Sequence, residues 1–282
     1  MSNLRGTVDI NQSSLYFEID GSGTPFLMIH AGITDSQQWH HEFSHFSRDY
    51  QVIRYDMRGY GKSKWTEDAP GHLEDLTALV KNLDIQPPII LMGCSMGGML
   101  ALEYAIKNPQ KIKALILLGP GLCGLELDVE EPEELSAAKK AFREGDLNLL
   151  AEIETQIWFD STDQDPGHVD CSMRALLYEM QHSLRSQKVG RKGIGQPEEK
   201  QAIQEFISQV DFPVLVVIGS YDLSYMHAAA DYLIDHVRSA RKEIIEDAAH
   251  LPNLDQPQLC LEVVDSFLED LTRGKRYDKI LP

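Results

Sequence analysis

The feature that most constrains the fold is residues 88–98, where a Gly-x-Ser-x-Gly motif follows a short apolar run. Residues 89–91 (Ile-Ile-Leu) predict a buried strand, and residues 100–106 predict a helix on the other side of the motif. A serine on so tight a turn needs glycine on both sides, at Gly93 and Gly97, because larger side chains would collide there. The motif therefore predicts an exposed hydroxyl beside the free amides of a first helical turn.

Apolar segments alternate with amphipathic helices on both sides of this motif. Strands that are apolar throughout and alternate with helices indicate an α/β fold, with a mostly parallel sheet covered by helices on both faces. The expected strands are residues 8–10, 15–18, 25–29, 51–55, 89–91, 114–118, 212–218 and 242–245. The expected helices of this part are residues 35–46, 73–83, 100–106, 226–237 and 258–271.

The alternation stops between residues 121 and 209, where the pattern predicts helices alone. These helices are expected at residues 132–143, 146–158, 170–185 and 197–208. We therefore expect a core made of residues 1–120 and 210–282, interrupted by an all-helical cap of residues 121–209.

The composition limits the kinds of molecule that this protein is expected to bind. The net charge of −18 disfavours nucleic acid and anionic membranes, both of which need clustered positive charge. No apolar run is long enough to span a bilayer, and the N-terminus lacks the apolar core of a signal peptide. The four cysteines form no C-x-x-C pair and are expected to be reduced thiols in a cytoplasmic protein. The expected partner is a small-molecule substrate, and a homodimer is left open.

The motif serine, Ser95, needs a base and an orienting acid to act as a nucleophile. Asp222 and His250 each follow a predicted strand, and ligands of parallel sheets bind at the carboxyl ends of strands. The two residues are 28 positions apart, enough for one helix and one strand. The sequence therefore predicts a Ser95, Asp222 and His250 triad. The alternatives are that Asp222 caps a helix, that His250 is a loop histidine, or that His227 is the base.

An acyl-transfer site also needs donors for the developing oxyanion. The Met96 amide is one candidate, because it follows the nucleophile and opens the helix. The second is expected in the loop after residues 25–29, at Gly32 or, failing that, Ile33.

Taken together, the motifs of this chain resemble the α/β-hydrolase superfamily over about residues 7–271. They are His-Ala-Gly at 30–32, Asp-Met-Arg-Gly-Tyr-Gly-Lys-Ser at 56–63, Gly-Cys-Ser-Met-Gly-Gly at 93–98, Gly-Ser-Tyr-Asp at 219–222 and Ala-His-Leu-Pro-Asn-Leu-Asp-Gln-Pro at 249–257. The resemblance implies the α/β-hydrolase fold, the triad, the oxyanion hole and a cap over the pocket. Within the superfamily the chain is similar to carboxylesterases, 3-oxoadipate enol-lactonases and meta-cleavage-product hydrolases.

Two positions refine the resemblance. Ala31 stands where family members usually carry a second glycine, and its methyl group is expected to narrow the oxyanion loop. Ser95 stands where haloalkane dehalogenases and epoxide hydrolases carry an aspartate, which disfavours those activities.

The cap is expected to set specificity. Ile33, Trp158 and Met180 are candidates for the pocket lining, although apolar residues at helical spacing often serve packing alone. A basic side chain could bind a substrate carboxylate, from the set Arg143, Arg174, Arg185, Lys188 and Arg191. No metal cluster or nucleotide motif is present in the sequence, so no metal and no cofactor is expected.

The sequence thus predicts a serine hydrolase that cleaves a small or medium-sized ester or lactone through an acyl-enzyme. Two alternatives stay open. One is a carbon–carbon bond hydrolase of the meta-cleavage-product type, and the other is a ligand-binding or sensor protein on the same fold.

Overall fold

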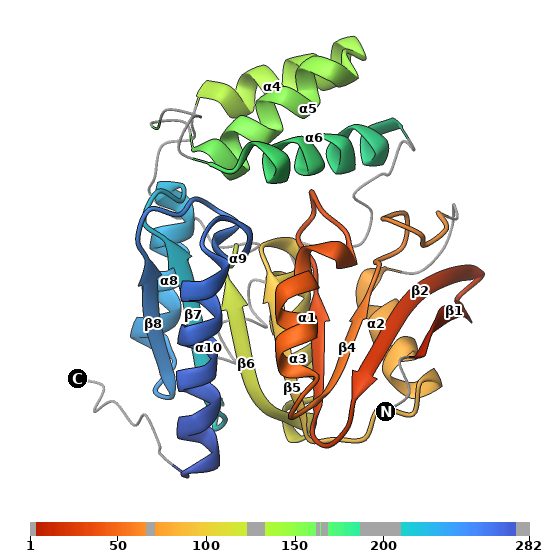
Figure 1. Ribbon diagram of the computed structural model, residues 1–282, viewed down its shortest axis with the longest axis vertical. Helices are drawn as coiled ribbons and strands as arrows, with labels where there is room; N and C mark the ends of the chain where they lie inside the picture. The colour runs from red at the N-terminus through yellow and green to blue at the C-terminus, as the bar shows by residue number, and fades with distance from the viewer. Residues whose placement is uncertain are drawn as a thin grey trace.

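The computed structural model describes residues 4–65, 71–122, 133–161, 164, 169–186 and 210–274. Its centre is an eight-stranded sheet of order β1-β2-β4-β3-β5-β6-β7-β8 (Figure 1). The strands are β1 (Leu4–Ile10), β2 (Ser13–Gly21), β3 (Pro25–Ile29), β4 (Gln51–Tyr55), β5 (Ile89–Cys94), β6 (Ile112–Leu118), β7 (Val214–Gly219) and β8 (Ala240–Ile245).

Strands β4, β3, β5, β6, β7 and β8 are mutually parallel, whereas β1 and β2 join the sheet antiparallel. The predicted mostly parallel α/β sheet is therefore confirmed. Parallel strands bring their carboxyl ends to one edge of the sheet, so the residues that follow β3, β5, β6, β7 and β8 become neighbours.

Helices cover both faces of the sheet (Figure 1). Alternate side chains of β5 enter two separate cores: Leu91 packs into the core that includes helices α2, α3 and α8, and Met92 into the core that includes α1 and α10. Two buried faces explain why these strands are apolar throughout. The helices are α1 (His40–Phe46), α2 (His72–Asn82), α3 (Met96–Lys107), α8 (Ser224–His236), α9 (Pro252–Asp255) and α10 (Pro257–Thr272), with 3₁₀ turns η1 (Ser36–Trp39) and η2 (Pro109–Lys111).

The turn between β5 and α3 has the steric demands that its sequence predicts. Ser95 has φ 50° and ψ −116°, a conformation that side-chain-bearing residues rarely adopt. A Cβ atom at Gly93 would lie 2.3 Å from the Gly97 carbonyl oxygen, and one at Gly97 would lie 2.3 Å from the Ile29 carbonyl oxygen. The second contact is with the neighbouring strand β3, so the glycines serve sheet packing as well as the turn itself.

Between β6 and β7 the described elements are all helical, and they lie beyond the carboxyl ends of the parallel strands (Figure 1). The Arg185 Nε atom donates to the Glu154 carboxylate at 2.9 Å, and the Gln181 amide donates to the Thr155 hydroxyl at 3.0 Å, which fastens α6 to α5. These elements are α4 (Glu133–Glu144), α5 (Leu147–Thr155), the π-helical turn η3 (Gln156–Asp160) and α6 (Cys171–Ser186). The fourth predicted helix, residues 197–208, lies outside the described residues.

Several local differences separate prediction and structure. Strand β1 begins at Leu4, ahead of the predicted residue 8, and helix α3 begins at Met96, ahead of the predicted residue 100. The helix predicted at 35–46 divides into η1 and α1, and the Asp35 side chain accepts a hydrogen bond from the Gln37 amide at its start. The helix predicted at 146–158 ends at Thr155 and continues as η3. Helix α9 was not predicted, because four residues are too few to show a period.

No helix in the described part of the chain combines the length and the apolar character needed to cross a membrane.

The glycine at position 97 gives a direct test of the contact between the turn and β3. Gly97→Ala places a methyl group against the Ile29 carbonyl, and we expect it to lower the free energy of unfolding by about 3 kcal/mol. Gly6→Ala is the matched control, since a Cβ atom there meets nothing within 4 Å. Urea denaturation measures both variants, and equal midpoints would contradict the steric account.

Candidate active site

Ser95 lies at the carboxyl end of β5, immediately before the first residue of α3. Its backbone N–H donates to the Leu118 carbonyl oxygen at 2.8 Å, which holds the turn against the end of β6. The residue remains partly exposed although its neighbours on both sides are buried. The strained backbone is therefore held in place while the hydroxyl stays accessible.

His250 and Asp222 come together at the ends of β8 and β7. The His250 Nδ1 atom lies 2.9 and 3.0 Å from the two oxygens of Asp222, and the Asp222 side chain is fully buried. The Leu223 amide donates to the same carboxylate at 2.8 Å, which fixes its orientation. With a proton on Nδ1 facing the carboxylate, Nε2 is left as an acceptor. This Nε2 atom is buried and has no hydrogen-bond partner among the residues that the structure describes.

Gly119 connects the serine turn with the histidine loop. It follows Leu118, to which Ser95 is hydrogen-bonded, and it adopts φ +50°. A Cβ atom at Gly119 would lie 2.9 Å from the His250 Nδ1 atom, so the imidazole rests on this glycine. Sequence reasoning did not identify Gly119, although a Gly-Pro pair directly after a predicted strand was a usable signal. Ser95 and His250 thus contact consecutive residues of the chain.

The two predicted oxyanion donors also lie side by side. A Cβ atom at Gly32 would lie 2.9 Å from the Met96 sulfur and 3.2 Å from its Cβ atom. Within the described ranges, neither the Gly32 nor the Ile33 amide has a hydrogen-bond acceptor. Met96 is the first residue of α3, so its amide has no acceptor within the helix. These amides are available to a ligand at the serine.

His30 holds the loop that carries Gly32. Its Nδ1 atom lies 2.7 Å from the Ala31 carbonyl oxygen and donates to it, and its Nε2 atom accepts from the Met57 amide at 3.0 Å. Burial lowers the pKa of this imidazole, against the opposing effect of the Asp56 carboxylate. A neutral ring with both nitrogens engaged explains how His30 links the loop to the end of β4.

Comparison with known proteins agrees with the observed fold. The family described as alpha/beta hydrolase fold matches residues 24–153. The chain is 25% identical over 241 residues to 3-oxoadipate enol-lactonase 2 of Acinetobacter baylyi, covering 84% of this chain and 85% of that protein. The chain has the α/β-hydrolase fold.

Two further proteins are similar to this chain over most of its length. The chain is 25% identical over 269 residues to 2-hydroxy-6-oxo-6-(2'-aminophenyl)hexa-2,4-dienoic acid hydrolase of Metapseudomonas resinovorans, covering 90% of this chain and 88% of the relative. The structure of a thermophilic esterase from Thermogutta terrifontis matches with a TM-score of 0.76 at 23% identity, covering 95% of this chain and 99% of that one.

Of the predicted lining residues, Trp158 of η3 contacts His250. Its ring lies 4.7 Å from the ring of His250, centroid to centroid, at an interplanar angle of 47°. The buried Asp160 in the same turn accepts from Arg174 Nε at 2.8 Å, which fixes the turn to α6. Ile33 is also buried, in the loop next to Gly32.

Met180 lines a cleft of about 360 Å³ between α6 and the core, and none of Ser95, Asp222 and His250 belongs to the lining. Two of the basic residues considered for substrate binding are already paired, Arg174 with Asp160 and Glu152, and Arg185 with Glu154. These arginines therefore stabilise the helical segment.

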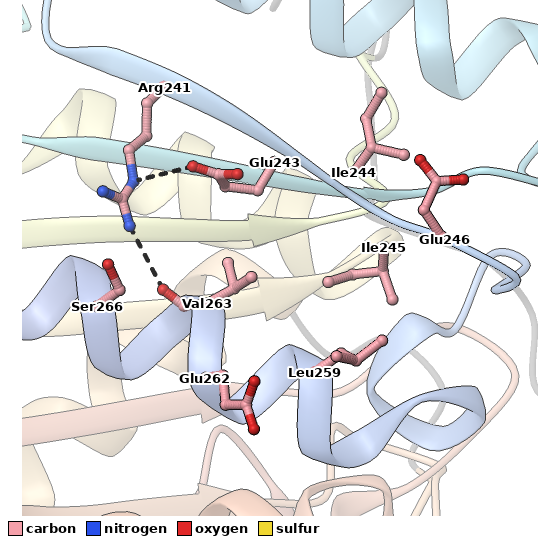
Figure 2. Close-up of a pocket in the computed structure, with 9 residues that line it drawn as sticks. All are labelled: Arg241, Glu243, Ile244, Ile245, Glu246, Leu259, Glu262, Val263 and Ser266. Carbon is pink, nitrogen blue, oxygen red and sulfur yellow. Dashed lines mark hydrogen bonds and ion pairs between the residues drawn. The ribbon is translucent and has the colours of Figure 1, made fainter.

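A second groove, of about 380 Å³, opens between β8 and α10 at the edge of the sheet (Figure 2). Its lining includes the apolar side chains Ile245 and Leu259 and the carboxylates Glu243, Glu246 and Glu262. Its lining contains no histidine and none of the predicted site residues, so this groove is not the predicted active site.

Cys94 directly precedes Ser95, but its thiol is buried. Its side chain packs into the core that contains α1 and α10, and burial raises the pKa of the thiol to about 12. It therefore stays protonated at neutral pH. In the described residues, no group of three or more His, Cys, Asp or Glu side chains is arranged to hold a metal ion.

Glu42, on α1, offers a test of the core beneath the site. Burial raises the pKa of its carboxyl from 4.5 to about 8, against its own backbone amide, Asn253 and Arg54. A raised carboxyl pKa contributes stability below about pH 4.5, and this contribution is lost as the pH rises toward 8. Glutamine does not ionise, so Glu42→Gln should not lose this stability. We expect its free energy of unfolding to exceed that of the native protein by a margin that grows with pH to about 4 kcal/mol at pH 8.

Urea denaturation of both proteins between pH 4.5 and 8.5 measures this advantage. Glu144→Gln is the control, because Glu144 is exposed at the end of α4. A difference between Glu42→Gln and the native protein that does not change with pH would show that the Glu42 carboxyl is ionised in the fold.

Proposed function

We propose that this protein is a serine hydrolase that cleaves a small or medium-sized ester or lactone. In this proposal Ser95 is the nucleophile, His250 the general base and Asp222 the acid that orients it. The observation that carries the proposal is the pose of His250, whose Nδ1 faces a buried carboxylate while its buried Nε2 has no partner in the described chain. An imidazole held in this way is set to accept a proton.

The reaction proceeds in two balanced steps. The Ser95 hydroxyl gives its proton to His250 Nε2 while its oxygen bonds to the substrate carbonyl carbon, and the alcohol or enol leaves with the proton that His250 returns. Water then attacks the acyl-enzyme in the same way, and the acid product leaves as Ser95 recovers its proton. Asp222 stabilises the imidazolium that forms in both steps.

The oxyanion of each tetrahedral intermediate is assigned to the amides of Met96 and Gly32, with Ile33 adjacent. The close contact between Gly32 and Met96 supports this assignment, as does the absence of other acceptors for the loop amides in the described residues. Each such donor typically lowers the barrier by about 3 kcal/mol.

The helical segment is proposed to act as a cap, residues 121–209, on a core of residues 1–120 and 210–282. The contact of Trp158 with His250 supports this role, because it places a cap side chain directly on the proposed base. Similarity to an enol-lactonase and to an esterase favours a lactone or ester as substrate.

A second candidate is hydrolysis of a carbon–carbon bond. The 25% identity over 90% of this chain to a hydrolase of a substituted hexa-2,4-dienoic acid favours it. Coloured dienoate substrates report this activity directly, and a rate on dienoates that exceeds the rate on esters would replace the first proposal with the second.

Replacement of the nucleophile tests the mechanism. Ser95→Ala removes the attacking oxygen, and we expect the burst of p-nitrophenol from a short acyl ester to vanish and kcat to fall by at least about 10³-fold. Labelling by a fluorophosphonate probe should be lost together with the burst. Ser44→Ala is the control, since Ser44 is exposed on α1.

Two results would contradict this mechanism. Turnover and labelling that persist in Ser95→Ala would exclude Ser95 as the nucleophile. Tight binding without turnover over a panel of esters, lactones and dienoates would favour a ligand-binding protein.

Trp158 tests the role of the cap. Trp158→Ala leaves the proposed triad intact but removes an aromatic wall, so we expect kcat/KM for a medium-length acyl ester to fall by about 10-fold. The loss should be smaller for an acetyl ester. Phe142→Ala is the matched control, because Phe142 is an aromatic side chain of α4 that is 60% exposed. An equal loss for both ester lengths would show that Trp158 does not contact the acyl chain.

A further inference from the structure

Gln38 joins two parts of the loop that carries Gly32. It belongs to η1 and is 1% exposed. Its side-chain oxygen accepts from the Ala31 amide at 2.8 Å and from the Thr34 hydroxyl at 2.6 Å. Both donors belong to the turn that contains Gly32, so one side-chain oxygen holds the two ends of this turn.

The nitrogen end of the same amide reaches the histidine loop. Gln38 Nε2 donates to the Asn253 side-chain oxygen at 3.2 Å, and the Asn253 amide donates back to the Gln38 carbonyl oxygen at 3.2 Å. Asn253 is fully buried in α9, three positions after His250. A reciprocal pair thus spans 215 positions of the sequence and joins η1 to the loop of the proposed base.

Gln38 also lies near the serine turn. Its side chain opposes the rise in the pKa of the Cys94 thiol that burial causes, and Cys94 directly precedes Ser95. One buried side chain therefore hydrogen-bonds to the oxyanion loop and to the element that follows the histidine.

Its partners determine how the Gln38 amide is oriented. The Ala31 backbone N–H is only a donor, so it must face the oxygen of the Gln38 side chain. The nitrogen must then face the Asn253 oxygen, which in turn places the Asn253 nitrogen against a carbonyl. Each hydrogen bond has one possible direction, and reversing either amide would set donor against donor in a buried site.

We infer that Gln38 is a positioning residue for the proposed reaction: its amide sets the oxyanion loop relative to the histidine loop. The inference rests on the proposed function. Because the Ala31 N–H is occupied by Gln38, the Gly32 and Ile33 amides are the ones left to face a ligand. Loss of the Gln38 amide would therefore disturb stabilisation of the transition state more than binding of the substrate.

The experiment compares Gln38→Leu with Gln37→Leu. Gln37 is exposed in the same turn, and its side chain reaches only Asp35 among the described residues. For Gln38→Leu we expect kcat on a p-nitrophenyl ester to fall by about 10²-fold while KM changes by less than about 3-fold. We expect Gln37→Leu to retain the kcat of the native protein.

Two inhibitors separate positioning from general damage. A trifluoromethyl ketone forms a tetrahedral adduct with a nucleophilic serine, and the carboxylate product does not. Affinity of Gln38→Leu for the ketone should fall in parallel with kcat/KM, and affinity for the carboxylate should stay unchanged. A kcat equal to that of the native protein, or an equal loss of affinity for both inhibitors, would overturn the inference.

Thr34 provides a second route in case Gln38→Leu does not fold. Thr34→Val removes one donor to the Gln38 oxygen at nearly constant volume, whereas Thr34→Ser keeps the hydroxyl. We expect kcat to fall by about 5-fold in the valine variant and to be retained in the serine variant. Equal kcat values in the two variants would overturn the inference. A native protein that neither turns over esters nor reacts with the fluorophosphonate probe would overturn the proposed function as well.

Discussion

Backbone-to-backbone contact at the carboxyl edge of the sheet is the constraint on which the rest of this structure depends. At Gly97 the start of α3 touches the carbonyl groups that end β3, and at Gly219 the end of β7 touches the carbonyl groups of Ala248 and Ala249. Contacts this close leave no room for a side chain. Main-chain contacts therefore hold the serine turn against the end of β3 and the histidine loop against the end of β7.

The polar groups of the site extend this rigidity. His30 joins the end of β3 to the loop after β4, and Gln38 joins the oxyanion loop to α9. Both side chains are almost fully buried. Each forms hydrogen bonds through both of its polar side-chain atoms. Buried polar networks of this kind favour one arrangement strongly, because any alternative leaves a desolvated group without a partner.

Local sequence patterns predicted much of this architecture. Strands β3 and β4 have the predicted bounds, because both segments are too short for a typical helix and are enriched in β-branched and aromatic residues. The meeting of Asp222 with His250 followed from their positions after strands. The pairing of Gln38 with Asn253 could not be predicted, since polar residues in short turns have no period and the two lie 215 positions apart. The contact of Trp158 with His250 could not be predicted either. It depends on the π-helical turn after Thr155, which turns side chains to angles that a regular 3.6-residue period does not predict.

The π-helical turn that carries Trp158 has a consequence for how this enzyme can diversify. This turn closes the α5 segment with its C-cap at Ser161, and its wider winding sets the side chains from Gln156 to Asp160 at other angles around the axis than a continued α-helix would give. A one-residue insertion or deletion between Gln156 and Asp160 would exchange the side chain that rests on the imidazole without altering any group that makes or breaks bonds. Changes in chain length within this one turn could therefore alter which substrates the enzyme accepts, while the residues proposed to carry out the reaction stay the same.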